Sequence, residues 1–239
     1  MAKRQEFAKP KEEPRKKIFL AFVLDESGSM GGATEETIAG MNEQIQQVKK
    51  DFDKDNMDVN VYFVKFNGNV EAVFMNKSIG DLKEITTEDY QPGGSTALYD
   101  AVGLALTEIQ SHKESKDDNA SILVTVISDG QDNSSTKFNA ETLSKMVKEC
   151  QDSKKWTFAY LGAEMDLAEA KANTGFYAGN MASFDTLSRS GRTKAFKVNR
   201  TALSSYASAV GMSTNSFADT EFYADRNTVD STEETAETK

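Results

Sequence analysis

The sequence predicts an α/β fold of three layers, in which helices cover both faces of a mainly parallel sheet that has one antiparallel edge strand. Short runs of Ile, Val, Leu and Phe alternate along the chain with segments whose apolar residues recur every three or four positions. These are the patterns of buried strands and of amphipathic helices. The dipeptide Asn67-Gly68 separates two strand-like runs. Asn-Gly is a strong hairpin signal because both turn positions take positive φ.

The elements follow from these patterns in chain order. The first expected strand covers residues 18–24, and the two hairpin strands cover residues 59–66 and 70–75. The helix between them has apolar residues at spacings of three and four, which places them on one face: Ile38, Met41, Ile45, Val48 and Phe52. The remaining elements are helices at about 96–112, 140–150, 167–172 and 193–210, and strands at 122–127, 156–161 and 181–184.

The length of 239 residues suits one medium domain with additional segments at its ends. Residues 1–17 hold seven Lys or Arg against three Glu, and we expect them to form a flexible basic arm. Residues 214–239 are expected to form an acidic, disordered tail, since residues 231–239 contain a single apolar side chain. The folded domain is therefore expected over residues 18–213.

Composition excludes several classes of function. The formal net charge of -10 disfavours sequence-independent binding to nucleic acid or to an anionic membrane. One cysteine and one histidine cannot form an internal disulfide or a Cys/His zinc site. The longest apolar run, residues 18–24, is much shorter than a membrane span, and the start of the chain lacks the apolar centre of a signal peptide. We expect a soluble, cytoplasmic protein.

Candidate metal ligands follow the central strands of the predicted sheet. Ligands of open parallel sheets bind beyond the carboxyl ends of the strands, where the strand order reverses. Asp25, Ser27 and Ser29 follow the first strand, Asp129 follows the strand at 122–127, and Thr96 lies in a loop that begins a helix. Carboxylate and hydroxyl oxygens suit Mg²⁺ or Mn²⁺. Two acids leave a divalent ion able to bind another anion, such as an Asp or Glu side chain of a partner protein.

The arrangement resembles the metal-ion-dependent adhesion site of von Willebrand factor A domains. The matching motifs are Asp25-x-Ser27-x-Ser29, Gly-Gly-Ser-Thr96-Ala-Leu-Tyr-Asp-Ala and Ser-Asp129-Gly. The segments Ser-Thr-Ala-Leu-Tyr-Asp-Ala-Val, Val-Ile-Ser-Asp-Gly-Gln-Asp-Asn and Trp-Thr-Phe-Ala-Tyr-Leu-Gly-Ala are similar to the compact intracellular branch found in bacteria and their phages. For a phage-encoded chain, the expected location is the host cytoplasm.

The resemblance covers about residues 17–212. It implies a Rossmann-like three-layer sandwich and Mg²⁺-dependent protein binding. The family pattern implies that Ser27, Ser29 and Thr96 are direct or near-direct ligands. It also implies that Asp25 and Asp129 hold coordinated water or switch into direct contact with the ion.

We therefore expect a non-catalytic interaction module in which bound Mg²⁺ bridges to an acidic residue of a partner. One alternative is a metal-assisted hydrolase or phosphotransferase at the same sheet edge. An aspartyl-phosphate enzyme is expected to have a second acid two residues after Asp25, where Ser27 stands, and the chain has no phosphate-binding Gly-x-x-x-x-Gly-Lys-Ser/Thr loop. Another alternative is a stoichiometric subunit of a larger bacterial or phage assembly.

Four further residues are interpreted as structural. Asp100 and Asp132 are each expected to act as a first-turn helix acid or a turn former rather than as an acid that supports the metal ligands. His112 stands near a predicted helix end, where it interacts with the helix dipole. Cys150 falls in phase with the apolar residues of its helix and is expected to be buried.

Overall fold

A computed structural model of the chain describes residues 15–54, 57–163, 167–185, 188–212 and 222–223. Within these residues, six strands form one sheet in the order β3-β2-β1-β4-β5-β6. The strands are β1 (Lys16–Asp25), β2 (Met57–Phe66), β3 (Val70–Ser78), β4 (Ala120–Ser128), β5 (Trp156–Ala163) and β6 (Met181–Phe184). The α-helices are α1 (Thr34–Phe52), α2 (Leu98–Ser111), α3 (Ala140–Asp152), α4 (Leu167–Thr174) and α5 (Arg189–Met212).

The sheet is parallel except at one edge. β1 pairs in parallel with β2 and with β4, and β5 pairs in parallel with β4 and with β6. β3 is antiparallel to β2, which confirms the hairpin predicted at Asn67-Gly68, although neither of these two residues has the positive φ on which the prediction was based. The mainly parallel α/β class is therefore confirmed.

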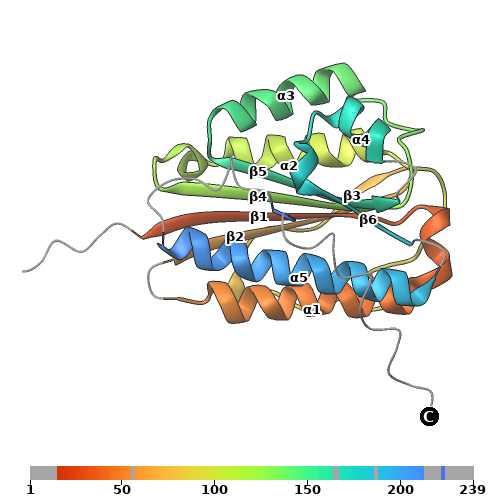
Figure 1. Ribbon diagram of the computed structural model, residues 1–239, viewed down its shortest axis with the longest axis horizontal. Coiled ribbons are helices and arrows are strands. Elements are labelled where there is room, and N and C mark those ends of the chain that lie inside the picture. The colour runs from red at the N-terminus through yellow and green to blue at the C-terminus, as the bar shows by residue number, and fades with distance from the viewer. Residues whose placement is uncertain (1–14, 55–56, 164–166, 186–187, 213–221, 224–239) are drawn as a thin grey trace, which may run out of the picture.

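Helices cover both faces of the sheet, with α1 and α5 on one face and α2, α3 and α4 on the other (Figure 1). The central strand β1 supplies both cores through alternate residues. Leu20 and Phe22 pack in the cluster that includes α1 and α5, whereas Ala21 and Val23 pack in the cluster that includes α2 and α3. Burial on both sides explains why the strand has an unbroken apolar sequence.

Two glycines allow aromatic rings to lie directly on helix backbones. A Cβ at Gly40 of α1 would stand 2.2 Å from the ring of Phe196 in α5. A Cβ at Gly103 of α2 would stand 2.5 Å from the ring of Phe138, which precedes α3. Glycine inside a helix normally destabilises it, so the close contact with each ring gives these positions a structural role.

Phe222 and Tyr223 belong to the folded body, although they fall within the segment predicted as an acidic tail. Both are buried in the same core cluster as α5. The hydroxyl of Tyr223 donates to Asn199 Oδ1 at 2.7 Å, and Asn199 Nδ2 donates to Gln44 Oε1 at 3.2 Å. This chain of hydrogen bonds joins the aromatic pair to α5 and α1. The apolar area of the two rings outweighs the acidic composition around them.

Several element boundaries differ from the sequence prediction. β1 begins at Lys16, two residues earlier than expected, and Arg15 forms an ion pair with Asp58 at 2.8 Å. α5 begins at Arg189, four residues before the expected start at 193. Most of the predicted basic arm and acidic tail lies outside the described residues. None of the helices in the described part of the chain is long and apolar enough to cross a membrane.

Gly40→Ala tests the contact between α1 and α5. We expect the substitution to lower the free energy of unfolding by roughly 1–3 kcal/mol, because the new methyl group overlaps the ring of Phe196. Urea unfolding followed by circular dichroism measures the change. Gly80→Ala is the matched control, since a Cβ there has no neighbour within 4 Å. Equal unfolding midpoints for Gly40→Ala and the wild type would contradict the packing described here.

Candidate metal centre

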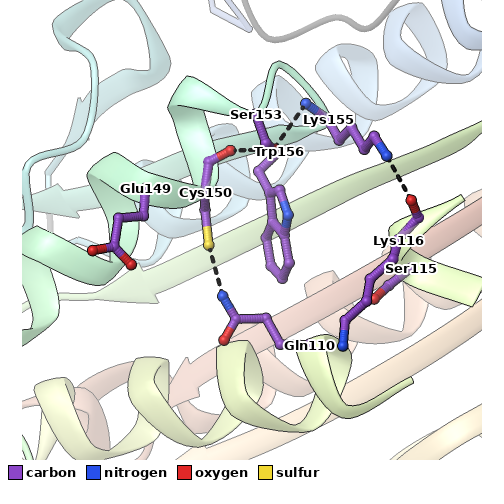
Figure 2. Close-up of a pocket in the computed structure, with 8 residues that line it drawn as sticks. All are labelled: Gln110, Ser115, Lys116, Glu149, Cys150, Ser153, Lys155 and Trp156. Atoms are coloured by element: carbon purple, nitrogen blue, oxygen red, sulfur yellow. Dashed lines mark hydrogen bonds between the residues drawn. The ribbon is translucent and has the colours of Figure 1, made fainter. Parts of the chain in front are cut away.

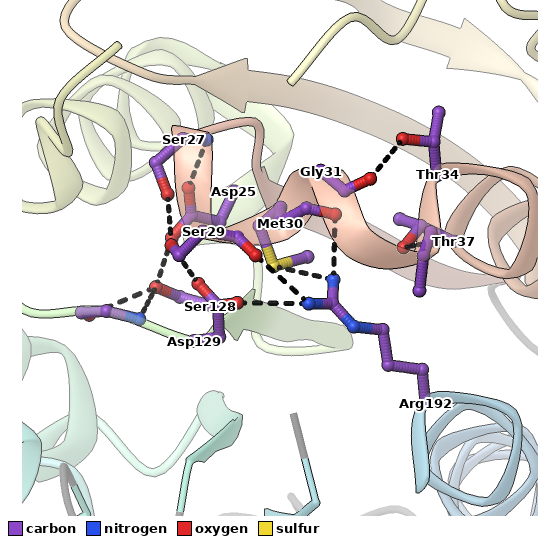
Figure 3. Close-up of polar contacts among 12 residues, drawn as sticks. Asp25, Ser27, Ser29, Met30, Gly31, Thr34, Thr37, Ser128, Asp129 and Arg192 are labelled. Atoms are coloured by element: carbon purple, nitrogen blue, oxygen red, sulfur yellow. Dashed lines mark hydrogen bonds and ion pairs between the residues drawn. The ribbon is translucent and has the colours of Figure 1, made fainter. Parts of the chain in front are cut away.

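The predicted site lies at the carboxyl edge of the sheet, where β1 and β4 are neighbours. The strand order reverses between these two strands, which is where open α/β sheets bind ligands. Asp25 is the last residue of β1, and Asp129 directly follows β4. Ser27 follows β1 directly before a short 3-10 helix, η1 (Gly28–Ala33), and Ser29 lies within that helix. Figure 3 shows these side chains converging.

Hydrogen bonds join four of the five predicted ligands. The backbone N–H of Ser27 donates to Asp25 Oδ1 at 2.7 Å, and the Ser128 hydroxyl donates to Asp25 Oδ2 at 2.5 Å. The hydroxyl oxygens of Ser27 and Ser29 lie 3.0 Å apart, and Ser29 Oγ donates to Asp129 Oδ1 at 2.6 Å (Figure 3). The structure therefore gathers these carboxylates and hydroxyls into one cluster of oxygens.

Thr96 completes the set from the loop before α2. A Cβ built on Gly130 would stand 3.7 Å from Thr96 Oγ1 and 4.0 Å from Ser29 Oγ, so both hydroxyls lie close to the same point. The backbone N–H of Thr96 donates to Asn133 Oδ1 at 2.8 Å, and its carbonyl accepts from the Asn133 N–H at 2.9 Å. These bonds fix the Thr96 loop against the segment that follows β4.

A buried ion pair between Glu26 and Lys65 holds the segment that precedes the Thr96 loop. Neither residue was predicted to have a role at the site. Lys65 Nζ lies 3.3 Å from Glu26 Oε1, and both side chains are at most 10% exposed. Glu26 Oε1 also accepts from the Gln91 N–H at 2.5 Å, while Lys65 Nζ donates to the Asp89 carbonyl at 2.8 Å. The pair ties the segment before the threonine loop to the ends of β1 and β2.

Arg192 contacts the candidate site, and the sequence patterns did not predict it there. It lies in the first turn of α5, its side chain is 2% exposed, and Nη2 is 3.2 Å from Asp129 Oδ2. Nη2 also donates to the Ser29 carbonyl at 3.3 Å, and Nη1 donates to the Met30 carbonyl at 3.1 Å (Figure 3). The predicted helix began at residue 193, and 63 residues separate Arg192 from Asp129. No local pattern marks such a contact.

Burial raises the pKa of Asp25 from the ordinary 3.8 to about 6. Hydrogen bonds from Ser128 and Ser27 act in the opposite direction, and the charge of Asp129 adds to the rise. The negative charge of Asp25 is therefore held in an unfavourable environment, solvated by neutral donors. A cation at this position would relieve that cost.

The donor set fits a hard divalent cation. Neighbouring oxygens in the cluster lie 2.6–3.0 Å apart, and ligands at adjacent corners of a Mg²⁺ octahedron lie about 2.9 Å apart. Among the described residues, no three His, Cys, Asp or Glu side chains group together as metal ligands. A site here would use hydroxyls for most of its protein ligands, and such hard oxygen donors suit hard divalent cations better than softer ions.

Asp100 and Asp132 both have structural contacts, but not those of the predicted roles, because Asp100 binds the loop after β4 and Asp132 binds the start of α2. Asp100 accepts from the backbone N–H groups of Thr136, Lys137 and Phe138 at 2.9, 2.9 and 2.8 Å. Burial opposes these bonds, yet the pKa of Asp100 is lowered overall. Asp132 accepts from a backbone N–H in the first turn of α2 at 3.1 Å. Both carboxylates are used by backbone donors rather than by the oxygen cluster.

His112 and Cys150 lie at the ends of α2 and α3 that point away from the candidate site. His112 is the residue that ends α2, as predicted, and its Nε2 lies 2.7 Å from Asn76 Nδ2. Cys150 is buried in the core, also as predicted, and burial raises its pKa to about 11. The neutral thiol is a poor nucleophile at ordinary pH.

A cavity of about 400 Å³ lies next to Cys150, between the last turns of α2 and α3 and the start of β5 (Figure 2). The residues that line it are Gln110, Ser115, Lys116, Glu149, Cys150, Ser153, Lys155 and Trp156. Gln110 Nε2 donates to Cys150 Sγ at 3.2 Å, and Lys155 Nζ donates to the Lys116 carbonyl at 2.7 Å. The Ser153 hydroxyl also donates to the Cys150 carbonyl at 2.6 Å, so these particular groups bond to one another in the cavity wall.

Comparison with known families matches residues 20–186 to the von Willebrand factor type A domain. A search of curated proteins finds no match. Solved structures share the fold at low sequence identity. A von Willebrand factor type A protein from Catenulispora acidiphila superposes with a TM-score of 0.53 at 16% identity, over 80% of this chain and 43% of that chain.

Two further structures are similar. The pilus adhesin SpaC from Lactobacillus rhamnosus GG, in an open conformation, gives a TM-score of 0.57 at 12% identity, over 81% of this chain and 30% of the adhesin. Proximal thread matrix protein 1 from the mussel byssus has zinc in its metal-ion-dependent adhesion site (MIDAS) motif. It gives a TM-score of 0.54 at 16% identity, over 82% of this chain and 49% of that chain. This chain spans less than half the length of each of these three proteins.

Asp25→Asn tests the electrostatic cost of the cluster without metal. The folded-state pKa of about 6 exceeds the ordinary 3.8, so the folded protein binds more protons than the unfolded chain between about pH 4 and 6. The stability of the wild type therefore falls as the pH rises through that interval. In EDTA at about pH 7.5, we expect the variant to be more stable by up to about 3 kcal/mol.

Urea unfolding of both proteins across this pH range measures the difference between their free energies of unfolding. The contributions of all other carboxylates cancel in this difference. Asp152→Asn, at an exposed position on α3, is the control and should change stability by less than about 0.5 kcal/mol. A difference between Asp25→Asn and the wild type that stays constant from about pH 4 to 7 would contradict the buried charge.

Proposed function

The chain belongs to the von Willebrand factor type A domain family, and we propose that it is a non-catalytic, metal-dependent protein interaction module. In this proposal, Asp25, Ser27, Ser29, Thr96 and Asp129 hold a divalent cation, Mg²⁺ or Mn²⁺. An Asp or Glu side chain of a partner protein then binds to the same ion.

The observation that carries the proposal is the oxygen cluster at the switch point of the sheet. Two carboxylates and three hydroxyls from three separate loops converge there, and Ser29 is exposed to solvent. Six exposed residues of the described loops at this edge are small or uncharged: Gly28, Gly31, Gly32, Gly94, Gln131 and Asn133. Along these six residues of the described chain, a side chain of another protein can approach the cluster without meeting a charged group.

Charge explains why such an interaction would depend on metal. The chain has a formal net charge of -10, and an acidic partner would be repelled by Asp25 and Asp129. A bound divalent cation supplies the positive charge to which a carboxylate coordinates. The residues of this chain hold the ion in place, and the exposed Ser29 side leaves room for the partner.

Burial of Asp25 disfavours the alternative of a phosphotransferase. The carboxylate of an aspartyl-phosphate enzyme must reach its substrate in line, whereas Asp25 is 0% exposed and accepts hydrogen bonds at both oxygens. The one histidine and the one cysteine of the chain lie at the opposite edge of the sheet and do not serve this site as base or nucleophile. The cluster is better suited to binding than to catalysis.

The double substitution Ser27→Ala plus Ser29→Ala tests the ligand assignment. We expect the variant to keep its secondary structure, because the two hydroxyls contribute little to the core, and to lose Mg²⁺ affinity by roughly tenfold or more. Calorimetric titration with Mg²⁺ and circular dichroism provide the two measurements. Ser204→Ala plus Ser208→Ala on α5, where both hydroxyls donate only to helix carbonyls in the bonds described, is the matched control. Unchanged affinity in the folded site variant would overturn the assignment.

Partner capture tests the function itself. The tagged chain is recovered from its native cell in Mg²⁺, in EDTA, and as Asp25→Ala in Mg²⁺, and the proteins that co-purify are identified by mass spectrometry. We expect a partner that is retained only by the wild type in Mg²⁺. Sedimentation of the recovered complex then separates a stoichiometric subunit from a transiently bound adaptor. Identical recoveries under all three conditions would rule out a metal bridge.

A further inference from the structure

A buried guanidinium touches the candidate metal site from α5. Arg192 Nη2 lies 3.2 Å from Asp129 Oδ2, while Asp129 Oδ1 accepts from Ser29 Oγ at 2.6 Å (Figure 3). The carboxylate is thus shared: one oxygen belongs to the hydroxyl cluster and the other to the arginine. Asp129 already has a cationic partner within the chain.

The arginine is fixed in this position by more than the ion pair. Nη1 donates to the Met30 carbonyl at 3.1 Å and contacts Met30 Sδ at 3.2 Å, and Nη2 donates to the Ser29 carbonyl at 3.3 Å. A side chain that is 2% exposed would leave these acceptors and an unpaired carboxylate behind if it moved away. We therefore expect Arg192 to stay beside Asp129 when the site is occupied.

The arginine changes the charge that the site offers to a cation. Asp25 and Asp129 contribute two negative charges, and Arg192 contributes one positive charge. The nearby Glu26 is compensated by its ion pair with Lys65 at 3.3 Å, and Glu71, which pairs with the same lysine at 3.3 Å, is 66% exposed to solvent. The hydroxyls of the cluster are neutral. Counted over the described residues, the cluster therefore has one net negative charge, so a divalent ion leaves it with one net positive charge.

We propose that Arg192 shifts the balance between cation binding and anion binding at this site. Its positive charge weakens the affinity for a free divalent cation and strengthens the hold on a carboxylate that joins the ion. The inference rests on the proposed function, because it concerns the same metal and the same acidic partner group. The inference adds that the positive charge of Arg192 keeps the divalent ion from filling the site until a partner carboxylate is present.

Thermodynamic linkage makes the coupling reciprocal: a carboxylate that tightens cation binding is itself bound more tightly when the cation is present. Removal of the arginine charge has two expected effects. Without the arginine, the charges of Asp25 and Asp129 are both uncompensated, which strengthens binding of the divalent cation in the absence of an anion. The occupied site becomes neutral, which reduces the additional attraction for an anion.

Calorimetric titration of the full chain with Mg²⁺, with and without sodium acetate at matched ionic strength, measures the coupling. In the wild type, we expect acetate to tighten Mg²⁺ binding by roughly tenfold. In Arg192→Gln, Mg²⁺ alone should bind about tenfold more tightly than in the wild type, and acetate should have a smaller effect. Arg192→Lys keeps the charge and should behave like the wild type. Arg189→Gln removes an exposed arginine from the same turn of α5 and should change Mg²⁺ affinity by less than about twofold.

Equal Mg²⁺ affinities in the wild type and in folded Arg192→Gln would overturn the inference while leaving the metal site in place. Absence of Mg²⁺ binding in every variant, with and without acetate, would instead overturn the proposed site and the inference together. Arg192→Met is a second neutral variant, which needs no polar partner, if the glutamine does not fold. In the wild type, a Mg²⁺ affinity that acetate leaves unchanged would refute the coupling without any variant.

Discussion

The parallel pairing of β1 with β4 is the constraint on which the candidate site depends. Their register places Leu24 opposite Ile127, so that Asp25 and Ser128 reach the same level at the carboxyl edge. Both strands are buried on both faces, and a slip of one residue would exchange the two sets of core side chains. The packing that stabilises the sheet therefore also sets the positions of the two carboxylates, and the loops need only bring hydroxyls to them.

Three buried carboxylates at this edge have their negative charge stabilised by different kinds of protein group. Glu26 pairs with Lys65, and Asp129 pairs with Arg192. Asp25 instead accepts from a backbone N–H and from the hydroxyl of Ser128. Neutral donors compensate a buried charge less well than a cation does. The difference marks the neighbourhood of Asp25 as the place where the fold leaves negative charge uncompensated, and this is also where the serine hydroxyls converge.

Sequence patterns were sufficient for the local features of the fold and the site. Apolar runs and helical spacing identify the strands and helices, and the residues directly after strands identify the loops that converge, because parallel strands end at a common edge. The patterns were insufficient where distant residues meet inside the protein. Arg192 is one example, since a lone arginine near a helix start normally faces solvent. The Glu26–Lys65 pair and the burial of Tyr223 are others, and each depends on packing between segments that are far apart in the chain.

Tyr223 also limits how α5 can be oriented on the sheet. Its hydroxyl bonds to Asn199 in the middle of the helix, and Gln44 of α1 donates to the Phe196 carbonyl at 2.9 Å. A shift of one residue along an α-helix rotates every side chain by about 100° and moves it by about 1.5 Å. Such a shift would break these buried bonds and would turn Arg192 away from Asp129. The aromatic residue near the chain end thus helps to set the electrostatic potential of a cluster at the far end of the helix.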